Sequence, residues 1–281
     1  MEVITSAQNP KIKNLLLLQE KSKARREQGL FVVEGQRELE HCLQAGYSIK
    51  TVFVCEEIAG SEACEEALSS ASLRDPVRAN APESASSPAR PAIISIPEQL
   101  YRKVAYREST EGIIAEVEYK ALTLDDLRLP ENPLIMVLES VEKPGNLGAV
   151  LRSADAAGAD AVLICDPLTD LFNPNLIRAS IGAVFTVPVV AAPSAQVIPW
   201  LQERGIQILT AQLQDSSLYY DVDMKRGTAL VMGTESTGLT DIWRKAASAH
   251  IRIPMLGRLD SLNVSVSAAI LLFEAVRQRQ G

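Results

Sequence analysis

The sequence predicts an α/β protein whose C-terminal half folds around a parallel β-sheet. Three observations predict this class. Short apolar runs alternate with helix-patterned segments through the second half of the 281-residue chain, and such alternation is typical of a parallel sheet. The run at residues 133–140 is almost wholly apolar, as in a strand buried on both faces. Clusters of Gly, Ser, Asn and Glu follow three of the runs, at strand ends where such sheets bind ligands.

The second half of the chain repeats a strand-then-helix unit. After the strand at 133–140, hydrophobic periodicity and strand-forming composition predict the later elements. We expect strands at 160–166, 187–192, 206–213, 227–235 and 251–255, and helices at 145–159, 173–185, 194–205, 239–249 and from about 261 to 279.

The first half of the chain is less regular. It predicts helices at 15–29 and 36–46 and strands at 31–35 and 49–57. Residues 69–92 are rich in Ser, Ala and Pro, so an irregular insertion is expected there. Residues 119–132 lack lasting periodicity and are predicted to form a linker. The expected domains are therefore residues 1–118 and residues 133–281.

Composition restricts the class of protein. Hydrophobic residues make up 47% and charged residues 22% of the chain, which is normal for a folded globular protein. No apolar run has the length of a membrane span, and the N-terminal stretch has the pattern of neither a secretion signal nor a transit peptide. The four cysteines form no CxxC pair. We therefore expect reduced thiols, a cytoplasmic location and no membrane partner.

Basic residues are concentrated near the N-terminus, although the net charge is −7. That net charge argues against a general nucleic-acid coat. A local basic stripe nevertheless permits directed contact with phosphates, whereas a solvated helix face is the alternative. The candidate RNA-binding residues are Lys11, Lys13, Lys23, Arg25 and Arg26.

The first polar cluster covers residues 139–152 and opens a predicted helix. Gly145 and Gly148 permit close approach of another group to the backbone, and Asn146 can cap a helix. Arg152 lies within an otherwise apolar helical run. A helix N-terminus with a nearby Arg suits an anion or a phosphodiester. The alternatives are an ordinary cap for Asn146 and a surface position for Arg152.

Two further clusters follow later strands. In the second, at 233–239, Glu235 lies between two glycines and is either a helix-dipole partner or an acceptor for a ligand or an arginine. In the third, at 253–269, hydroxyl and amide side chains enter an apolar helix. Ser and Asn compete for backbone hydrogen bonds and suit caps and loops. This pattern predicts a loop-to-helix junction that holds a small polar ligand, with an ordinary N-cap as the alternative.

Several kinds of site are excluded by their missing motifs. His41 and His250 are the only histidines, and no ligand-spaced cysteine accompanies either, so no metal site is expected. The chain lacks the GxSxG turn of α/β hydrolases, and it lacks a P-loop and a dinucleotide-binding GxGxxG. The chemistry is therefore expected to use Arg, Glu, Ser and Asn.

The three clusters together resemble the SpoU/TrmH class of the SPOUT RNA methyltransferases. The matches are N-x-G-x-x-x-R at 146–152, G-x-E-x-x-G-L at 233–239, and I-P-M followed by S-L-N-V-S-V within 253–266. Residues 173–188 are similar to the middle segment of this class. Residues 4–13 and 31–35 resemble the ribosomal-protein-like substrate-binding domain of its ribosomal-RNA members.

The resemblance implies a fold and an activity. The fold is a parallel-sheet domain with a deep trefoil knot, an exception to the rule that chains are unknotted, preceded by a small ribosomal-protein-like α/β domain. The implied activity is methyl transfer from S-adenosylmethionine to a ribose 2′-hydroxyl, by a homodimer that completes its active site across the interface. The domain layout favours ribosomal RNA as the substrate. A tRNA 2′-O-methyltransferase and a non-catalytic RNA-binding or ribosome-assembly homologue are the alternatives.

The resemblance also implies site residues by motif position. The implied catalytic residues are Asn146, Arg152, Glu235, Ser261 and Asn263, and the implied cofactor contacts are Thr210, Gly233, Ile253, Met255 and Leu262. In this class the arginine is described as the group that activates the hydroxyl. A guanidinium gives up its proton reluctantly, so we favour stabilisation of developing negative charge, and both roles stay open.

Overall fold

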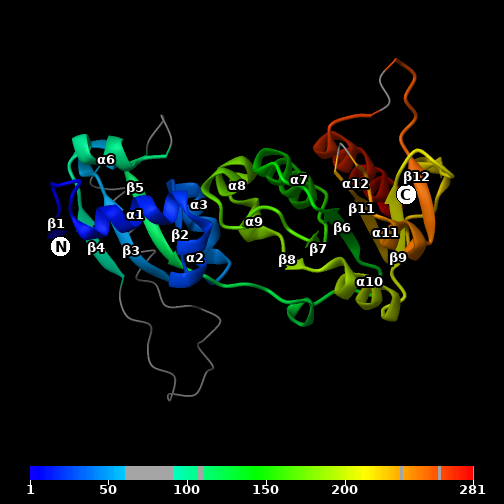
Figure 1. Cartoon of the computed structure of the whole chain (residues 1–281), viewed down its shortest axis with the longest axis horizontal. Helices are drawn as coiled ribbons and strands as arrows, with labels where there is room; N and C mark the ends of the chain where they lie inside the picture. Colours follow the sequence, from blue (N-terminus) through cyan, green and yellow to red (C-terminus); the bar gives the residue numbers. More distant parts are fainter. Residues whose placement is uncertain (61–90, 107–110, 235–236, 259–260, 281) are drawn as a thin grey trace. The chain divides into compact units, whose positions relative to one another are not determined.

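The computed structural model describes residues 1–60, 91–106, 111–234, 237–258 and 261–280 (Figure 1). Most of the predicted insertion at 69–92 therefore lies outside the described residues. The chain divides into two compact units. Unit 1 comprises Met1–Lys120 and Phe172–Arg178, and unit 2 comprises Ala121–Leu171 and Ala179–Gly281.

Unit 1 is built on a five-stranded mixed sheet in the order β1-β4-β3-β5-β2. β4 pairs in parallel with β1 and β3, and β5 pairs antiparallel with β2 and β3. The strands are β1 (Glu2–Val3), β2 (Leu30–Glu34), β3 (Ile49–Val54), β4 (Ala92–Ser95) and β5 (Ile113–Glu118). The helices are α1 (Pro10–Glu20), α2 (Ser22–Gln28), α3 (Gln36–Gln44), α4 (Glu56–Ala59) and α6 (Glu98–Val104).

The single helix predicted at 15–29 is wrong, because the structure divides it into α1 and α2. Lys21 adopts an extended conformation with φ −111° and ψ 110° and ends α1. The Arg25 side chain then donates hydrogen bonds from Nη1 to the carbonyl oxygens of Leu18 and Gln19, at 2.6 and 3.1 Å. These carbonyls in the last turn of α1 lack intrahelical partners, so the buried arginine stabilises the break.

Unit 2 is built on a seven-stranded sheet in the order β10-β12-β9-β11-β6-β7-β8, and every pair in it is parallel. The predicted α/β class is therefore confirmed. The strands are β6 (Leu134–Glu139), β7 (Ala161–Cys165), β8 (Val189–Ala192), β9 (Gln207–Ala211), β10 (Ser217–Leu218), β11 (Thr228–Met232) and β12 (Ala249–Arg252). The helices are α7 (Pro144–Ala156), α9 (Ala183–Thr186), α10 (Ser194–Glu203), α11 (Asp241–Ala246) and α12 (Val264–Gln280), with 3-10 turns at Leu124–Asp126 and Tyr219–Asp221. α8 (Pro174–Ser180) begins within the Phe172–Arg178 part of unit 1 and ends in unit 2.

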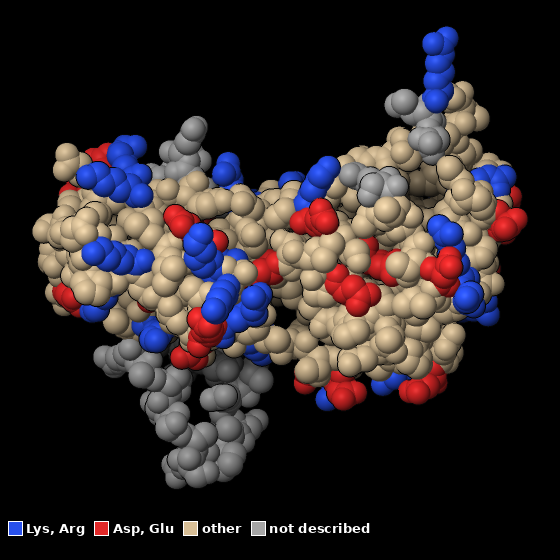
Figure 2. Space-filling view, in the orientation of Figure 1, with Lys and Arg blue, Asp and Glu red and all other residues tan. Residues whose placement is uncertain are grey.

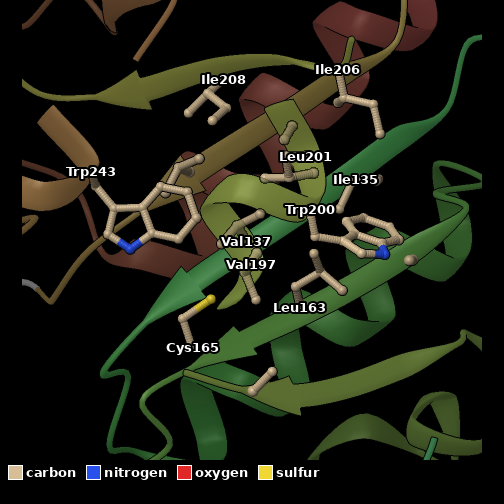
Figure 3. Close-up of a cluster of buried hydrophobic side chains, with 14 of the residues drawn as sticks. Ile135, Val137, Leu163, Cys165, Val197, Trp200, Leu201, Ile206, Ile208 and Trp243 are labelled. Carbon is tan, nitrogen blue, oxygen red and sulfur yellow. The ribbon is translucent and has the colours of Figure 1, made fainter. Parts of the chain in front are cut away.

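Helices cover both faces of the unit 2 sheet. On one face, side chains of β6 and β7 such as Ile135 and Leu163 pack with Val197, Trp200 and Trp243 from α10 and α11 (Figure 3). Alternate residues of a strand point to opposite faces, and α7 and α12 pack together on the other face (Figure 1). This double cover explains why the run at 133–140 is almost wholly apolar.

The helix predicted at 173–185 is also divided. α8 ends at Ser180, and α9 begins at Ala183. Between them Ile181 and Gly182 have φ angles of +52° and +81°, in the left-handed region that a right-handed helix cannot continue through. The apolar periodicity of the segment is the same on both sides of the break, so the pattern alone did not reveal it.

Most of residues 119–132, predicted to form a linker, belong to unit 2 and pack against its core. Leu122, Leu124, Leu127 and Leu129 pack against the core cluster that contains Trp200, and Leu122 forms a parallel bridge with Val190. The Thr123 and Asp126 side chains form a capping box around a 3-10 turn. The knot implied by the resemblance stays a prediction.

Candidate active site

The first and third polar clusters meet at the N-terminal ends of two packed helices. Asn146 lies in the first turn of α7, and Asn263 directly precedes α12. The Asn263 Nδ2 atom donates a hydrogen bond to Asn146 Oδ1 at 3.1 Å. Asn263 Oδ1 accepts hydrogen bonds from the backbone N–H and the hydroxyl of Ser265, at 3.0 and 2.6 Å. Asn263 therefore caps α12 and also joins it to α7.

The two glycines beside Asn146 have different surroundings. A Cβ on Gly148 would lie 2.6 Å from Ala179 Cβ and 2.7 Å from Ser180 N, so this glycine allows α7 to pack closely against the end of α8. A Cβ on Gly145 would have no atom within 4 Å. Backbone N–H groups in a first helical turn lack intrahelical acceptors. The first turn of α7 therefore offers donors beside open space, as an anionic or polar ligand requires.

In the second cluster, which follows β11, residues 233 and 234 lie in close backbone contact with Gly238, and this contact is called the neck. Gly238 N donates to Thr234 O at 3.0 Å, and the same two residues form an antiparallel bridge. A Cβ on Gly233 would lie 2.2 Å from Gly238 O, which no side chain could tolerate. Glu235, predicted to be catalytic, lies outside the described residues.

The predicted cofactor contacts lie at the carboxyl end of neighbouring strands. β9 pairs with β11 on one side and with β12 on the other, so the chain segments that follow these three strands share one edge of the sheet. Thr210 is fully buried in β9, and its hydroxyl forms a 2.6 Å hydrogen bond with His250 Nδ1. β12 ends at Arg252, so the predicted strand at 251–255 is wrong in its extent, and Ile253 and Met255 lie half-buried in the following loop.

The loop before α12 presents apolar side chains next to polar ones. Leu256 is 97% exposed and Leu262 is 37% exposed, and Ser261 and Asn263 are exposed. Exposed leucines beside hydroxyl and amide groups suit a ligand that has both apolar and polar parts. Together with the backbone of Gly233, this donor set fits S-adenosylmethionine, which combines an adenine ring with an amino-acid group.

Arg152 is exposed on α7, six residues after Asn146. Among the residues that the structure describes, none forms a hydrogen bond or an ion pair with its side chain. At about 100° per residue, Arg152 lies about 120° around the helix from Asn146. The guanidinium is therefore available to a phosphate, and it lies on a different face of α7 from the contact with Asn263.

Two carboxylates at strand ends were not assigned a role from the sequence. Glu139 ends β6 and is 2% exposed, and its oxygens accept hydrogen bonds from Thr240. Asp166 follows β7 and accepts a 2.5 Å hydrogen bond from the Ser194 hydroxyl. Burial, with the negative charge of Asp166 as a secondary cause, raises the pKa of the neighbouring Cys165 thiol to about 12. An acidic residue directly after an apolar strand was the signal that could have found both carboxylates.

The basic stripe is divided between exposed and buried positions. Lys11, Lys13, Lys23 and Arg26 are exposed. Lys11 and Lys23 form ion pairs with Glu2 and Glu27, at 2.5 and 3.7 Å. In Figure 2, Lys and Arg side chains of unit 1 are interspersed with Asp and Glu on the face shown.

Arg25 is the exception within the stripe. Its side chain is 1% exposed and is bonded to the end of α1. A guanidinium in this position cannot reach an RNA phosphate, so the prediction that Arg25 contacts RNA is corrected. The pattern of charged and apolar residues in the single helix predicted at 15–29 gave no sign that Arg25 is buried.

The described part of the chain contains neither a metal-binding group of side chains nor a membrane-spanning helix. Within those residues, no three His, Cys, Asp or Glu side chains are grouped so that they could bind a metal ion. None of the helices there is both long enough and apolar enough to span a membrane.

Two protein-family models match the chain, one in each half of the sequence. Residues 133–273 match the SpoU rRNA Methylase family. The chain belongs to the SpoU rRNA methylase family. Residues 9–115 match the MRM3-like substrate binding domain. The predicted class is therefore confirmed: the chain is an S-adenosylmethionine-dependent RNA methyltransferase of the ribose 2′-O type.

Three similar proteins give the extent of this likeness. The 23S rRNA (guanosine-2'-O-)-methyltransferase RlmB of Ralstonia nicotianae is 38% identical over 183 residues, which are 63% of this chain and 74% of the relative. A crystal structure of an RNA 2'-O ribose methyltransferase is 38% identical, with a TM-score of 0.81, and the match covers 99% of this chain and 100% of that one. An AdoMet-bound rRNA methyltransferase from Sinorhizobium meliloti is 29% identical, with a TM-score of 0.85, and the match covers 98% and 97%.

Proposed function

We propose that this chain methylates a ribose 2′-hydroxyl in 23S ribosomal RNA, at a site formed by the N-terminal ends of α7 and α12 and the segments that follow β9, β11 and β12. The observation that carries the proposal is the hydrogen bond between Asn146 and Asn263, which brings together two clusters far apart in the sequence. The 23S rRNA substrate named for the Ralstonia relative supports the choice of RNA, and such a substrate agrees with the expected cytoplasmic location.

Five residues near the ends of these strands and before α12 are proposed to hold the cofactor: Thr210, Gly233, Ile253, Met255 and Leu262. The close packing at Gly233 keeps side chains away from the backbone after β11, so that backbone groups there can contact a ligand directly. S-adenosylmethionine, when bound, supplies an electrophilic methyl group on a positively charged sulfur. The work left to the protein is to align the ribose oxygen with that methyl group, which can contribute several kcal/mol to catalysis.

Asn146, Ser261 and Asn263 are proposed to orient the ribose and the methionine part of the cofactor, and Glu235 to hold an arginine or a loop in place. Arg152 is proposed to bind the phosphate next to the target ribose and to stabilise negative charge that develops on its oxygen. Its exposure and the lack of a described partner support this assignment. A guanidinium remains protonated in proteins, which argues against its acting as a general base.

Unit 1 is proposed to bind the RNA. The match of residues 9–115 to a substrate-binding domain supports this role, and Lys11, Lys13, Lys23 and Arg26 supply exposed cations. Sequence-specific recognition of RNA targets single-stranded loops, whose unstacked bases can be read by a protein, so a single-stranded loop is the expected target.

The active protein is proposed to be a homodimer. Val266 and Phe273 are 47% and 48% exposed, and their spacing of seven residues places them on one face of α12. Exposed apolar faces of this kind mark protein interfaces. The position of Arg152, turned away from the contact between Asn146 and Asn263, supports a site that a second copy completes.

The proposal is tested by binding and transfer measurements on the full chain. Calorimetry should detect binding of S-adenosylmethionine, and 23S rRNA from cells that lack the protein should accept one methyl group per ribosome in vitro. Arg152→Ala should reduce transfer by about 100-fold or more, as loss of a charge-stabilising donor does, with unchanged cofactor binding and thermal stability. Transfer to tRNA alone would replace the substrate, and a lack of cofactor binding would favour a non-catalytic assembly factor. Near-normal transfer by Arg152→Ala would refute the role of that residue.

A further inference from the structure

Thr240 occupies the N-cap position of α11 in an unusual way. A threonine at this position normally accepts a hydrogen bond from a backbone N–H in the first turn of its own helix. Here its side chain makes no such capping bond. Its hydroxyl instead donates to Glu139 Oε1 at 2.5 Å, and its backbone N–H donates to Glu139 Oε2 at 2.8 Å. Both polar hydrogens of Thr240 are therefore directed at one carboxylate.

Glu139 lies at the end of β6, beside the end of β11. Leu138, the residue before it, pairs with Met232, the last residue of β11. Gly233 therefore follows β11 beside the end of β6, and Thr240 is hydrogen-bonded to the end of the same strand at Glu139. Glu139 is 2% exposed, whereas Thr240 is exposed, so these bonds are partly buried. Hydrogen bonds to a carboxylate are stronger than those between neutral groups.

A second chain of hydrogen bonds connects α11 to the end of the neighbouring strand β7. Trp243 Nε1 donates to Ser194 Oγ at 2.9 Å, and Ser194 Oγ donates to Asp166 Oδ2 at 2.5 Å. Trp243 itself is fully buried in the core cluster (Figure 3). Strand-end carboxylates of β6 and β7 thus anchor the start and the middle of α11.

We propose that Glu139 is a positioning residue for methyl transfer, which acts through Thr240 to keep the neck at Gly233 and Gly238 in the shape that binds the cofactor. This inference rests on the proposed function, because it assumes that Gly233 contacts S-adenosylmethionine. Each carboxylate oxygen takes one hydrogen from Thr240. In an amide at position 139 only the oxygen accepts hydrogen bonds, and the NH₂ group donates, so it cannot accept one hydrogen on each terminal atom.

The experiment measures the affinity for S-adenosylmethionine by calorimetry and the stability by urea unfolding, in the full chain. Glu139→Gln and Thr240→Val should each raise the Kd by about tenfold, the scale of losing one charge-assisted hydrogen bond. Thr240→Ser keeps both donors and should stay within about twofold of the wild type. The double variant Glu139→Gln/Thr240→Val should be less impaired than the two single effects combined, because the residues act as one unit.

Thr228→Val provides a matched control at the opposite end of β11. Thr228 is fully buried, and its hydroxyl donates to Arg226 O at 2.7 Å. This variant should lower stability while leaving the Kd for the cofactor unchanged, which separates positioning from general destabilisation. Equal cofactor affinity in Thr240→Val and Thr240→Ser would overturn this inference but would leave the proposed function standing. A lack of binding by the wild type would overturn the proposed function, and the inference with it.

Discussion

Two adjacent arginines of the basic stripe differ completely in their surroundings. Arg25 is 1% exposed and bonded to two carbonyl oxygens at the end of α1, whereas Arg26 is exposed. The sequence treats them alike because charge and local propensity do not depend on which side of a helix meets a core. Only the break at Lys21, which folds α2 back toward the end of α1, decides that one guanidinium is buried.

This difference gives a prediction for unit 1. Arg25→Ala should lower the free energy of unfolding by about 2–3 kcal/mol, because it leaves buried carbonyl groups without a donor and removes side-chain packing. Arg26→Ala is the matched control and should leave stability within about 0.5 kcal/mol of the wild type. Arg26→Ala should instead weaken RNA binding and reduce its salt dependence. Urea unfolding and filter binding at several salt concentrations measure both. Equal stability of the two variants would contradict the structural role of Arg25.

The carboxyl group of Glu116 gives a prediction about pH. Burial in β5 raises the pKa of Glu116 above its ordinary value, although hydrogen bonds to it oppose this, including one from Asn14. A raised pKa in the folded state means that the stabilising contribution is complete below the unfolded pKa, near 4.3, and is lost as pH rises through the folded value. Glu116→Gln cannot ionise, so it should be more stable than the wild type at pH 7, by about 1 kcal/mol or less.

The comparison with acidic conditions tests this prediction. The advantage of Glu116→Gln should shrink as pH falls toward 4, because the wild-type carboxyl becomes protonated there. Glu118→Gln changes an exposed carboxylate in the same strand and should show no such trend. Urea unfolding of the three proteins across this pH range gives the difference directly. An advantage that grows toward low pH would have the wrong sign and would refute the prediction.

At the scale of elements, the two glycines of α7 are expected to respond differently to substitution, because Gly148 is crowded and Gly145 is not. Gly148→Ala should cost about 1–3 kcal/mol of stability, since its Cβ would lie 2.6–2.7 Å from atoms of Ala179 and Ser180 and force α7 and α8 apart. Gly145→Ala meets no atom within 4 Å, and alanine favours a helix, so stability should be unchanged or rise by up to about 1 kcal/mol.

The same pair also tests the ligand site. If RNA or cofactor approaches the first turn of α7, Gly145→Ala should reduce methyl transfer despite its stable fold. Thermal melting and transfer assays on both variants separate the two effects. Full activity of Gly145→Ala would show that no ligand comes close to this part of the backbone.

Element boundaries show where sequence patterns lose their power. The helix predicted from about 261 to 279 starts three residues before α12 (Val264–Gln280) begins and ends one residue before α12 ends, since the apolar pattern of the segment is continuous. The helices at 15–29 and 173–185 were each predicted as one because an extended residue at 21 and a left-handed pair at 181–182 interrupt no periodicity. Such breaks are imposed by the packing of neighbouring elements.

At the scale of the whole molecule, the apolar face of α12 gives a prediction about assembly. Val266→Asp places a charge on this face, where the side chain is 47% exposed. It should convert the proposed dimer to a monomer in sedimentation experiments, because burying an unpaired carboxylate in an interface is unfavourable. Methyl transfer should fall with it, since the active site is proposed to need both copies.

A control variant outside α12 completes this test. Leu168 is 60% exposed in unit 2, and Leu168→Asp should leave both the oligomeric state and the activity unchanged. A wild-type protein that sediments as a fully active monomer would contradict the dimer, whatever the variants show.

The sequence by itself determined the α/β class, the strand-and-helix alternation of the second half, the family and its chemistry, because these follow from short-range periodicity and from motifs that each lie within one segment. Only the tertiary structure decided which residues meet. Asn146 and Asn263 are 117 positions apart, and Glu139 and Thr240 are 101 apart. Tertiary packing likewise buried Arg25 and left Arg26 exposed. Contacts of this kind depend on how the packed strands and helices bring distant segments together, and no local pattern in the chain encodes that arrangement.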